Sequence, residues 1–189
     1  MGRWEPGAQG RLQLAALELF AKRGYSAVTI ADIAEAAGLT KRTFFNHFPD
    51  KREILFAGAG AFEESVVNHL RSIPHDVAAL EAVVQALSIA GSELARYREF
   101  SILRRDLIAL NVELRERDLI KMVSLTDAIA VELLKRRVGA TQASLAAQIG
   151  ISIFNWAYDR WILGNDLDLS ELMRTTLFDV RSIVDVVAT

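Results

Sequence analysis

The sequence predicts an all-α protein built from about nine helices. Through most of its 189 residues, apolar side chains recur three and four positions apart, which is the spacing that lines one face of an α-helix. No stretch has the strict alternation of apolar and polar residues that is typical of a β-strand. No internal repeat or low-complexity linker interrupts the pattern, so helix is expected to follow helix to the end of the chain.

The composition is that of a globular protein, with 51% hydrophobic and 24% charged residues. The absence of cysteine excludes disulfides, thiolate metal sites and a cysteine nucleophile. The first ten residues lack the apolar run of a signal peptide, and no stretch approaches the roughly 20 apolar residues of a membrane span. We therefore expect a cytoplasmic protein that does not enter a membrane.

The first helix is expected over Arg11–Arg23, and Gly24 ends it because glycine readily adopts the left-handed conformation that stops a helix. A second helix begins after Thr29, whose hydroxyl can cap it while Asp32 supplies the acidic half of a capping box. Gly38 ends this helix after about two turns.

A third, short helix is expected over Lys41–His47, with Thr40 as its cap. It closes at Phe48, because a proline disfavours helix in the residue that precedes it. A capping pattern at 50–53 then opens a long helix that is expected to continue to about Arg71.

The second and third helices are joined only by the turn at 37–40, which makes them a helix-turn-helix. A plain helical hairpin inside a bundle has the same geometry, so the surface of the third helix is the better guide. Phe44 and Phe48, four residues apart, can anchor this helix inward. A helix that enters the major groove of DNA needs hydrogen-bond donors on its outer side. Such donors crowd the two turns: Thr40, Lys41, Arg42, Thr43, Asn46 and His47.

Charge is divided unevenly along the chain. Residues 1–55 carry eight Lys and Arg against six Asp and Glu, a net +2, whereas the remainder carries fourteen against eighteen, a net −4. The overall net charge of −2 is unfavourable for binding nucleic acid, but the N-terminal excess of positive charge agrees with a DNA-binding segment there.

The run 29–55, together with 16–25 before it, resembles the DNA-binding signature of the TetR (tetracycline repressor) family in one unbroken register. The resemblance covers about residues 10–56 and implies a dimeric repressor that binds a palindromic DNA operator. It implies phosphate contacts from Thr29, His47 and Lys51. It implies base or groove contacts from Lys41, Arg42, Thr43, Phe45 and Asn46.

Some of these residues also have purely structural interpretations. Many family members carry tyrosine where this chain has Phe45, so a phenolic hydrogen bond to phosphate is not available here, and packing on a sugar or a thymine methyl group is the alternative. Thr29 and Thr40 can act mainly as helix caps. Lys51 and Arg52 can simply be solvated at a helix start.

The remaining residues are expected to form a second domain of helices, which gives a DNA-binding domain at 1–55 and a ligand-binding and dimerisation domain at 56–189. Helices are expected over 76–95, 98–111, 113–138, 141–163 and 169–187. The last two are apolar around much of their circumference, so each needs cover on two sides. One side can be the core and the other a second copy of the chain, although a central core helix in a monomer has the same pattern. The predicted dimer residues are Phe154, Trp161, Met173, Leu177, Val180 and Val184.

We expect a small apolar effector molecule to bind in a cavity between the middle helices, because small-molecule sites are generally apolar with a few polar groups. A fully packed core is the alternative. The polar candidates are Arg104, Asn111, Asn155 and Tyr158.

Catalytic signatures are absent from the sequence. The three histidines show no metal-ligand spacing, the Gly58–Gly60 segment follows no strand as a dinucleotide loop would, and no nucleophile elbow or P-loop motif occurs. We expect no cofactor, no metal and no enzymatic activity. The sequence therefore predicts a ligand-responsive DNA-binding repressor that acts as a homodimer. A regulator controlled by a protein partner or by abundance is the alternative, and a helical enzyme or binding module is a more distant one.

Overall fold

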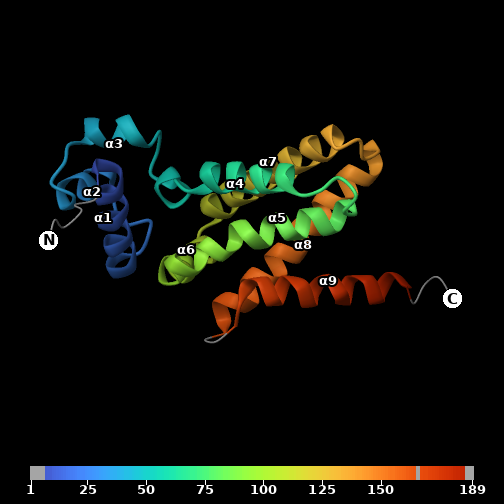
Figure 1. Ribbon diagram of the computed structural model, residues 1–189. Helices are drawn as coiled ribbons and strands as arrows, with labels where there is room; N and C mark the ends of the chain where they lie inside the picture. The colour runs from blue at the N-terminus through green and yellow to red at the C-terminus, as the bar shows by residue number, and fades with distance from the viewer. Residues whose placement is uncertain (1–6, 165–166, 186–189) are drawn as a thin grey trace, which may run out of the picture. The chain divides into compact units, whose positions relative to one another are not determined.

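The computed structural model of the protein describes residues 7–164 and 167–185, with side chains through residue 183 (Figure 1). Over these residues the chain forms nine α-helices and two short 3-10 helices and no strand, so the predicted all-α class is confirmed. The chain divides into two compact units. The head unit comprises the chain up to Ala59 together with Glu99–Leu119, and the body unit comprises Gly60–Arg98 and the chain from Ile120 onward.

The head unit begins with three helices, α1 (Ala8–Arg23), α2 (Ile30–Ala36) and α3 (Lys41–His47), followed by a 3-10 helix at Arg52–Leu55. Two segments from later in the chain complete it, most of α6 (Arg98–Leu110) and the start of α7 (Val112–Lys135). They contribute three buried side chains to the same hydrophobic core: Leu107, Ile108 and Leu114. The expected domains, 1–55 and 56–189, are two continuous segments. In the structure, Glu99–Leu119 instead belongs to the head unit.

The long helix expected from residue 50 to about 71 is interrupted. One 3-10 turn ends at Leu55, and α4 (Ala59–Ser72) begins only after a short break. Leu55 and Phe56, at the end of the 3-10 turn, are both buried in the core of the head unit.

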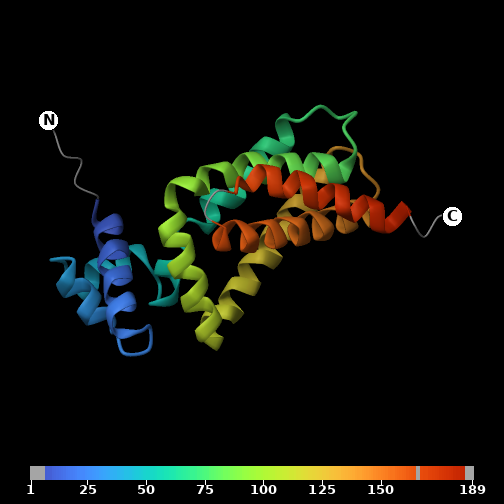
Figure 2. The ribbon, with the colours of Figure 1, turned by 90° about the horizontal axis from the view of Figure 1, so that it is seen from below.

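The body unit contains α4, α5 (Ala79–Ser92), a 3-10 turn at Glu93–Tyr97, the rest of α7, α8 (Ala140–Leu163) and α9 (Leu169–Asp185). Helices α5, α8 and α9 pack against one another, and Figure 2 shows α9 lying alongside the other two.

Small residues allow α5 and α8 to approach closely. A Cβ atom on Gly150 of α8 would lie only 2.3 Å from Cγ1 of Val83 on α5. Alanines surround this contact on both helices, so the close crossing depends on the absence of side-chain volume: Ala82, Ala86, Ala143, Ala146 and Ala147.

The C-terminal end of α4 is held within the body unit by Arg136, the residue that directly follows α7. Arg136, only 7% exposed, donates hydrogen bonds to the carbonyl oxygens of Leu70, Ile73 and Pro74 at 2.6–2.9 Å. The Leu70 carbonyl lies in the last turn of α4 and those of Ile73 and Pro74 follow it, so the buried guanidinium acts as a C-terminal cap.

Candidate nucleic-acid interface

The N-terminus of α2 is held by the capping box that the sequence predicts. The Thr29 hydroxyl accepts a hydrogen bond from the backbone N–H of Asp32 at 3.2 Å, and the Asp32 carboxylate accepts one from the backbone N–H of Thr29 at 2.8 Å. The same hydroxyl donates to the carboxylate at 2.8 Å. These hydrogen bonds from Thr29 keep the pKa of Asp32 below its usual value. The Thr29 hydroxyl is thus engaged as a cap, which is the structural interpretation of this residue.

The turn between α2 and α3 depends on one glycine. Gly38 has φ +63°, in the left-handed region that glycine occupies without strain. The Arg11 guanidinium donates to the carbonyl oxygen of Ala37 at 2.5 Å and lies 2.9 Å from the position of a Cβ atom on Gly38. Helix α1 therefore fixes the turn that orients α3.

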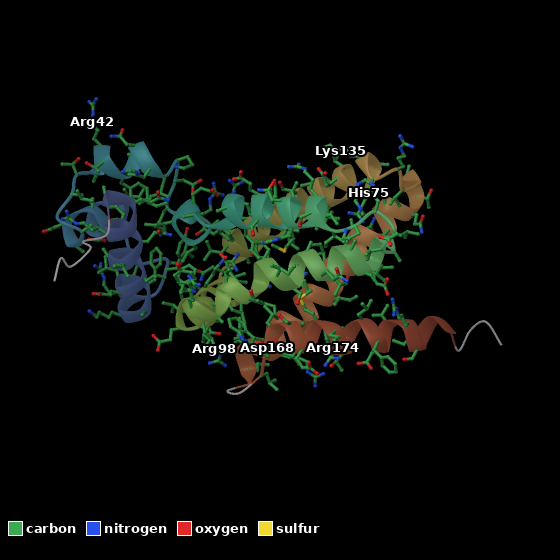
Figure 3. The ribbon with its side chains drawn as sticks, viewed as in Figure 1. Arg42, His75, Arg98, Lys135, Asp168 and Arg174 are labelled. Carbon is green, nitrogen blue, oxygen red and sulfur yellow. The ribbon has the colours of Figure 1, made fainter. Side chains whose placement is uncertain are left out.

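Helix α3 is anchored by its inner face. Phe44 is fully buried and Phe48 nearly so, and the centroids of their rings lie 5.4 Å apart. Arg42 and Asn46 each lie two positions from Phe44, which turns them about 200° away from it. Both are exposed, and Figure 3 shows Arg42 extending from α3 away from the rest of the head.

Most of the α3 residues that are predicted to contact DNA are exposed. Thr40 accepts a hydrogen bond from the backbone N–H of Thr43 at 3.1 Å, and the two hydroxyls lie 2.9 Å apart, so both engage within the helix start. Thr43 is half-buried. The remaining predicted residues of this helix are exposed and together form one surface: Lys41, Arg42, Phe45, Asn46 and His47.

Lys51 differs from the phosphate contact that the resemblance implies. Its ammonium nitrogen donates to the carbonyl oxygens of Tyr25 and Val28, each at 2.9 Å, and lies 4.0 Å from the centroid of the Tyr25 ring. Burial disfavours the charged form of both residues. It therefore lowers the pKa of Lys51 and raises the pKa of Tyr25. The side chain thus joins the start of the 3-10 helix to the segment between α1 and α2.

Charged side chains from α6 and α7 brace the head unit, which the sequence analysis did not anticipate. Arg104 pairs with Asp118 at 2.5 Å and donates to the carbonyl oxygen of Leu55 at 3.2 Å. It also lies over the Phe56 ring, 4.8 Å from the centroid. Arg117 of α7 pairs with Glu53. The only sequence signal for these contacts is charged residues beside the apolar positions of α6 and α7, and any exposed helix has such residues.

These contacts change the interpretation of the predicted ligand residues. Arg104 is engaged within the head unit, as is Asn111, whose amide donates to the carbonyl oxygen of Leu107 at 2.7 Å as α6 ends. Asn155 and Tyr158 belong instead to α8 of the body unit, where Asn155 is exposed. The four residues therefore do not form one site within either unit.

Tyr158 is part of an aromatic row in the body unit. Its ring stacks on Phe154 with centroids 5.7 Å apart, and it lies 5.6 Å from Trp161. Phe62 of α4 extends the row, 5.5 Å from Phe154. Tyr158 and Phe62 are half-buried, whereas the other two are buried.

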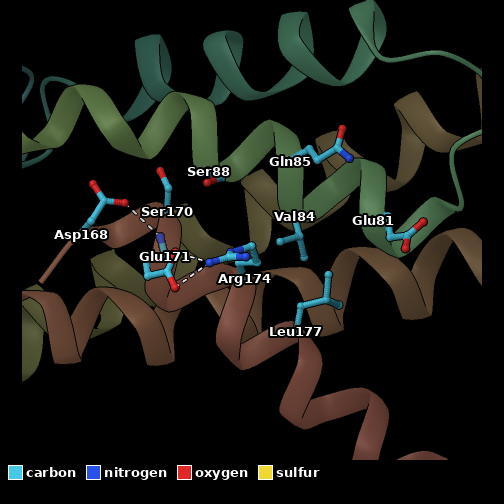
Figure 4. Close-up of a pocket in the computed structure, with 9 residues that line it drawn as sticks. All are labelled: Glu81, Val84, Gln85, Ser88, Asp168, Ser170, Glu171, Arg174 and Leu177. Atoms are coloured by element: carbon cyan, nitrogen blue, oxygen red, sulfur yellow. Dashed lines mark hydrogen bonds and ion pairs between the residues drawn. The ribbon is translucent and has the colours of Figure 1, made fainter.

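A groove of about 410 Å³ lies between α5 and α9 (Figure 4). Its lining differs from the apolar cavity that the sequence predicts, because seven of its nine lining residues are polar or charged and only two are aliphatic. Arg174 and Glu171 pair across its α9 side at 2.5 Å. The residues that line it are Glu81, Val84, Gln85, Ser88, Asp168, Ser170, Glu171, Arg174 and Leu177.

The predicted dimer residues require a correction. Phe154, Trp161 and Met173 are buried in the protomer's own core, so they offer no surface to a partner. Leu177 and Val180 are half-buried, and the side chain of Val184 lies outside the described residues. The apolar residues that α8 and α9 leave exposed are different ones: Leu145, Trp156, Leu163, Phe178 and Ile183.

A capped helix, a tight turn and a short second helix follow one another in the chain. The second helix is anchored by its inner face and has a basic and polar outer surface. This arrangement defines a helix-turn-helix DNA-binding protein. Residues 14–57 match the family model for bacterial regulatory proteins of the tetR family. The N-terminal segment of the chain is thus similar to the DNA-binding region of this family of transcription regulators, in agreement with the resemblance over about residues 10–56.

Two proteins similar in sequence to this chain are named as transcriptional regulators. The chain is 25% identical over 189 residues to MftR of Mycobacterium tuberculosis, which is named as a mycofactocin biosynthesis transcriptional regulator, with 95% of this chain and 92% of MftR covered. It is 31% identical over 94 residues to the HTH-type regulator CymR of Pseudomonas putida, which covers 50% of this chain and 46% of CymR.

Solved structures share the fold over both units. Thermus thermophilus FadR, a TetR-family transcriptional repressor solved in complex with lauroyl-CoA, aligns with a TM-score of 0.59 and 23% identity over 89% of this chain and 91% of FadR. NalD of Pseudomonas aeruginosa, the secondary repressor of the MexAB-OprM multidrug efflux pump, aligns with a TM-score of 0.59 and 19% identity over 90% and 93%.

In the part of the chain that the structure describes, no group of three or more histidine, aspartate or glutamate side chains is placed to hold a metal ion. No helix within 7–164 or 167–185 is long and apolar enough to cross a membrane.

Proposed function

We propose that this regulator represses transcription by binding a palindromic operator as a homodimer, and that a small effector molecule releases it. The observation that carries the DNA-binding half is the outer surface of α3, where Arg42 and Asn46 face directly away from the buried Phe44. Guanidinium and amide groups form bidentate hydrogen bonds with guanine and adenine in the major groove.

Two copies are proposed because one short helix contacts few base pairs. A two-fold symmetric dimer doubles the contacted sequence and places two α3 helices in successive major grooves, about 34–36 Å apart. The exposed apolar stripe on α8 supports this arrangement. Leu145, Ile149, Trp156 and Leu163 are spaced so that they share one face of the helix, and three of them are exposed.

An effector is proposed to bind in the body unit. About two-thirds of the chain lies outside the segment that reads DNA. In the body unit, the half-buried Phe62 and Tyr158 offer apolar ring surface and one phenolic hydroxyl, and the buried rings of Phe154 and Trp161 pack against them. FadR, which shares this fold, was solved with lauroyl-CoA, so acyl-CoA thioesters are the first probes to try.

The deciding experiment is selection of binding sites from random duplex DNA, followed by thermal-shift and DNA-release measurements with acyl-CoA of increasing chain length. We expect an enriched palindrome and a probe that both raises the melting temperature and weakens DNA binding, because ligand and operator affect each other reciprocally. Enrichment of DNA with no response to any probe would favour the ligand-independent regulator. Failure to enrich any sequence would contradict the proposal.

A further inference from the structure

Phe45 is a large apolar side chain on a polar surface. We propose that it reads the 5-methyl group of a thymine in the operator and so selects thymine at one position of each half-site. The inference rests on the proposed function, since it requires α3 to enter the major groove. It adds to that function the chemical group that Phe45 recognises and the base that carries this group.

The structure turns the Phe45 ring outward and holds it there. The residue is 54% exposed, although it is flanked in the chain by the fully buried Phe44. Its ring meets the Phe44 ring edge to face, with centroids 5.6 Å apart and planes at 82°. Such a pair is a favoured aromatic geometry, so the buried ring supports the exposed one.

The exposed side chains that surround Phe45 on α3 are polar or charged. Lys41 lies one turn before it, and Arg42 and Asn46 occupy the face directly opposite Phe44. These three side chains can bond to phosphates, guanine and adenine. A phenyl ring has no donor or acceptor, so Phe45 can contribute only through apolar contact.

The major groove offers one apolar group among its base edges, the 5-methyl group of thymine. Covering that methyl removes apolar area of both partners from water, which favours binding. The apolar faces of the sugars are an alternative contact, but they are the same for every base and would give no preference for sequence.

The test uses the full chain and the operator recovered by selection. Each thymine is replaced in turn by deoxyuridine, which removes the methyl group and leaves base pairing unchanged. At one thymine per half-site we expect about a three- to fivefold loss of affinity, the factor for one methyl group leaving a contact. Phe45→Ala should bind more weakly and no longer distinguish thymine from uracil there, whereas Phe45→Tyr should still distinguish them.

Leu14→Ala is the matched control, because Leu14 lies on α1 of the same head unit and is also 54% exposed. This variant should keep the preference for thymine. The ratio of affinities for the two DNAs is measured within one protein preparation, so it does not depend on the folded fraction of a variant. The inference alone is overturned if no uracil weakens binding by the wild type, or if Phe45→Ala still discriminates at the same position. Failure to select any DNA would overturn both this inference and the proposed function.

Discussion

The ammonium nitrogen of Lys51 lies 2.9 Å from the carbonyl oxygen of Tyr25 and 4.0 Å from the centroid of the ring of the same residue. A second carbonyl, that of Val28, accepts from it at the same distance. Two of its three N–H groups are therefore used inside the head unit, where they tie together segments more than twenty positions apart in sequence.

Replacing Lys51 by methionine should therefore act first on stability. We expect the free energy of unfolding to fall by about 1–3 kcal/mol, because two carbonyl oxygens lose a charged donor. Urea denaturation measures this, with the exposed Lys22→Met on α1 as a control that should change stability by no more than about 0.5 kcal/mol. The slope of log affinity against log salt should stay near that of the wild type. A fall of about one unit per bound head, with unchanged stability, would show that this ammonium binds phosphate instead.

Arg42 should determine a guanine in each half-site. Arg42→Ala should lose about 1–3 kcal/mol of discrimination at one base pair, while preferences elsewhere persist. Arg42→Lys is the informative comparison, because it keeps the charge and loses the two-pronged donor geometry. Selection of binding sites with each variant measures the change. Identical base preferences for the wild type and Arg42→Lys would mean that Arg42 contacts only the DNA backbone.

The exposed face of α8 should carry the dimer contact. Trp156→Glu places a charge in the centre of its apolar stripe and should yield monomers with unchanged helix content, as measured by sedimentation and circular dichroism. Val123→Glu on α7 is the matched control, because Val123 is 59% exposed and Trp156 is 57% exposed. That variant should remain dimeric. Monomers from Val123→Glu alone would move the interface to α7.

Arg136 should be among the most sensitive positions of the body unit. Arg136→Met removes the donor from three carbonyl oxygens near the end of α4, which should cost roughly 3 kcal/mol of unfolding free energy or more. Lys135→Met, next to it, removes an exposed ammonium group from the buried Glu132, which keeps its ion pair with Arg71, and should cost about 1 kcal/mol or less. Thermal or urea denaturation of both variants compares them. Equal losses would contradict the capping role of Arg136.

The helix-turn-helix could be predicted from sequence because its signals are local. Thr29 with Asp32, Gly38, and Thr40 each specify a helix end within a few residues, and the structure reproduces all three. The position of Lys51 could not be predicted in this way, since the two carbonyls that it binds come from another segment and carry no sequence signature.

The sequence also could not predict which side of α8 is buried in the protomer. Its sequence is apolar around much of the helix, so periodicity alone does not distinguish the side that packs in the protomer from the side that is left exposed. Phe154 and Trp161 proved to be inside, whereas Trp156 is outside. The difference arises from the close crossing at Gly150, which directs that side of α8 toward α5.

The return of Glu99–Leu119 to the head unit has a consequence for how the protein is made. A ribosome releases the helix-turn-helix early, but the side chains of Leu107, Ile108 and Leu114 that complete its core emerge only about 50 residues after Ala59. During that interval the nascent head has an uncovered apolar surface, and its final packing waits for sequence-distant partners. An excised fragment ending near residue 59 would retain this incomplete core permanently. A chimaera that exchanges DNA specificity between relatives should therefore transfer 99–119 together with the N-terminal segment.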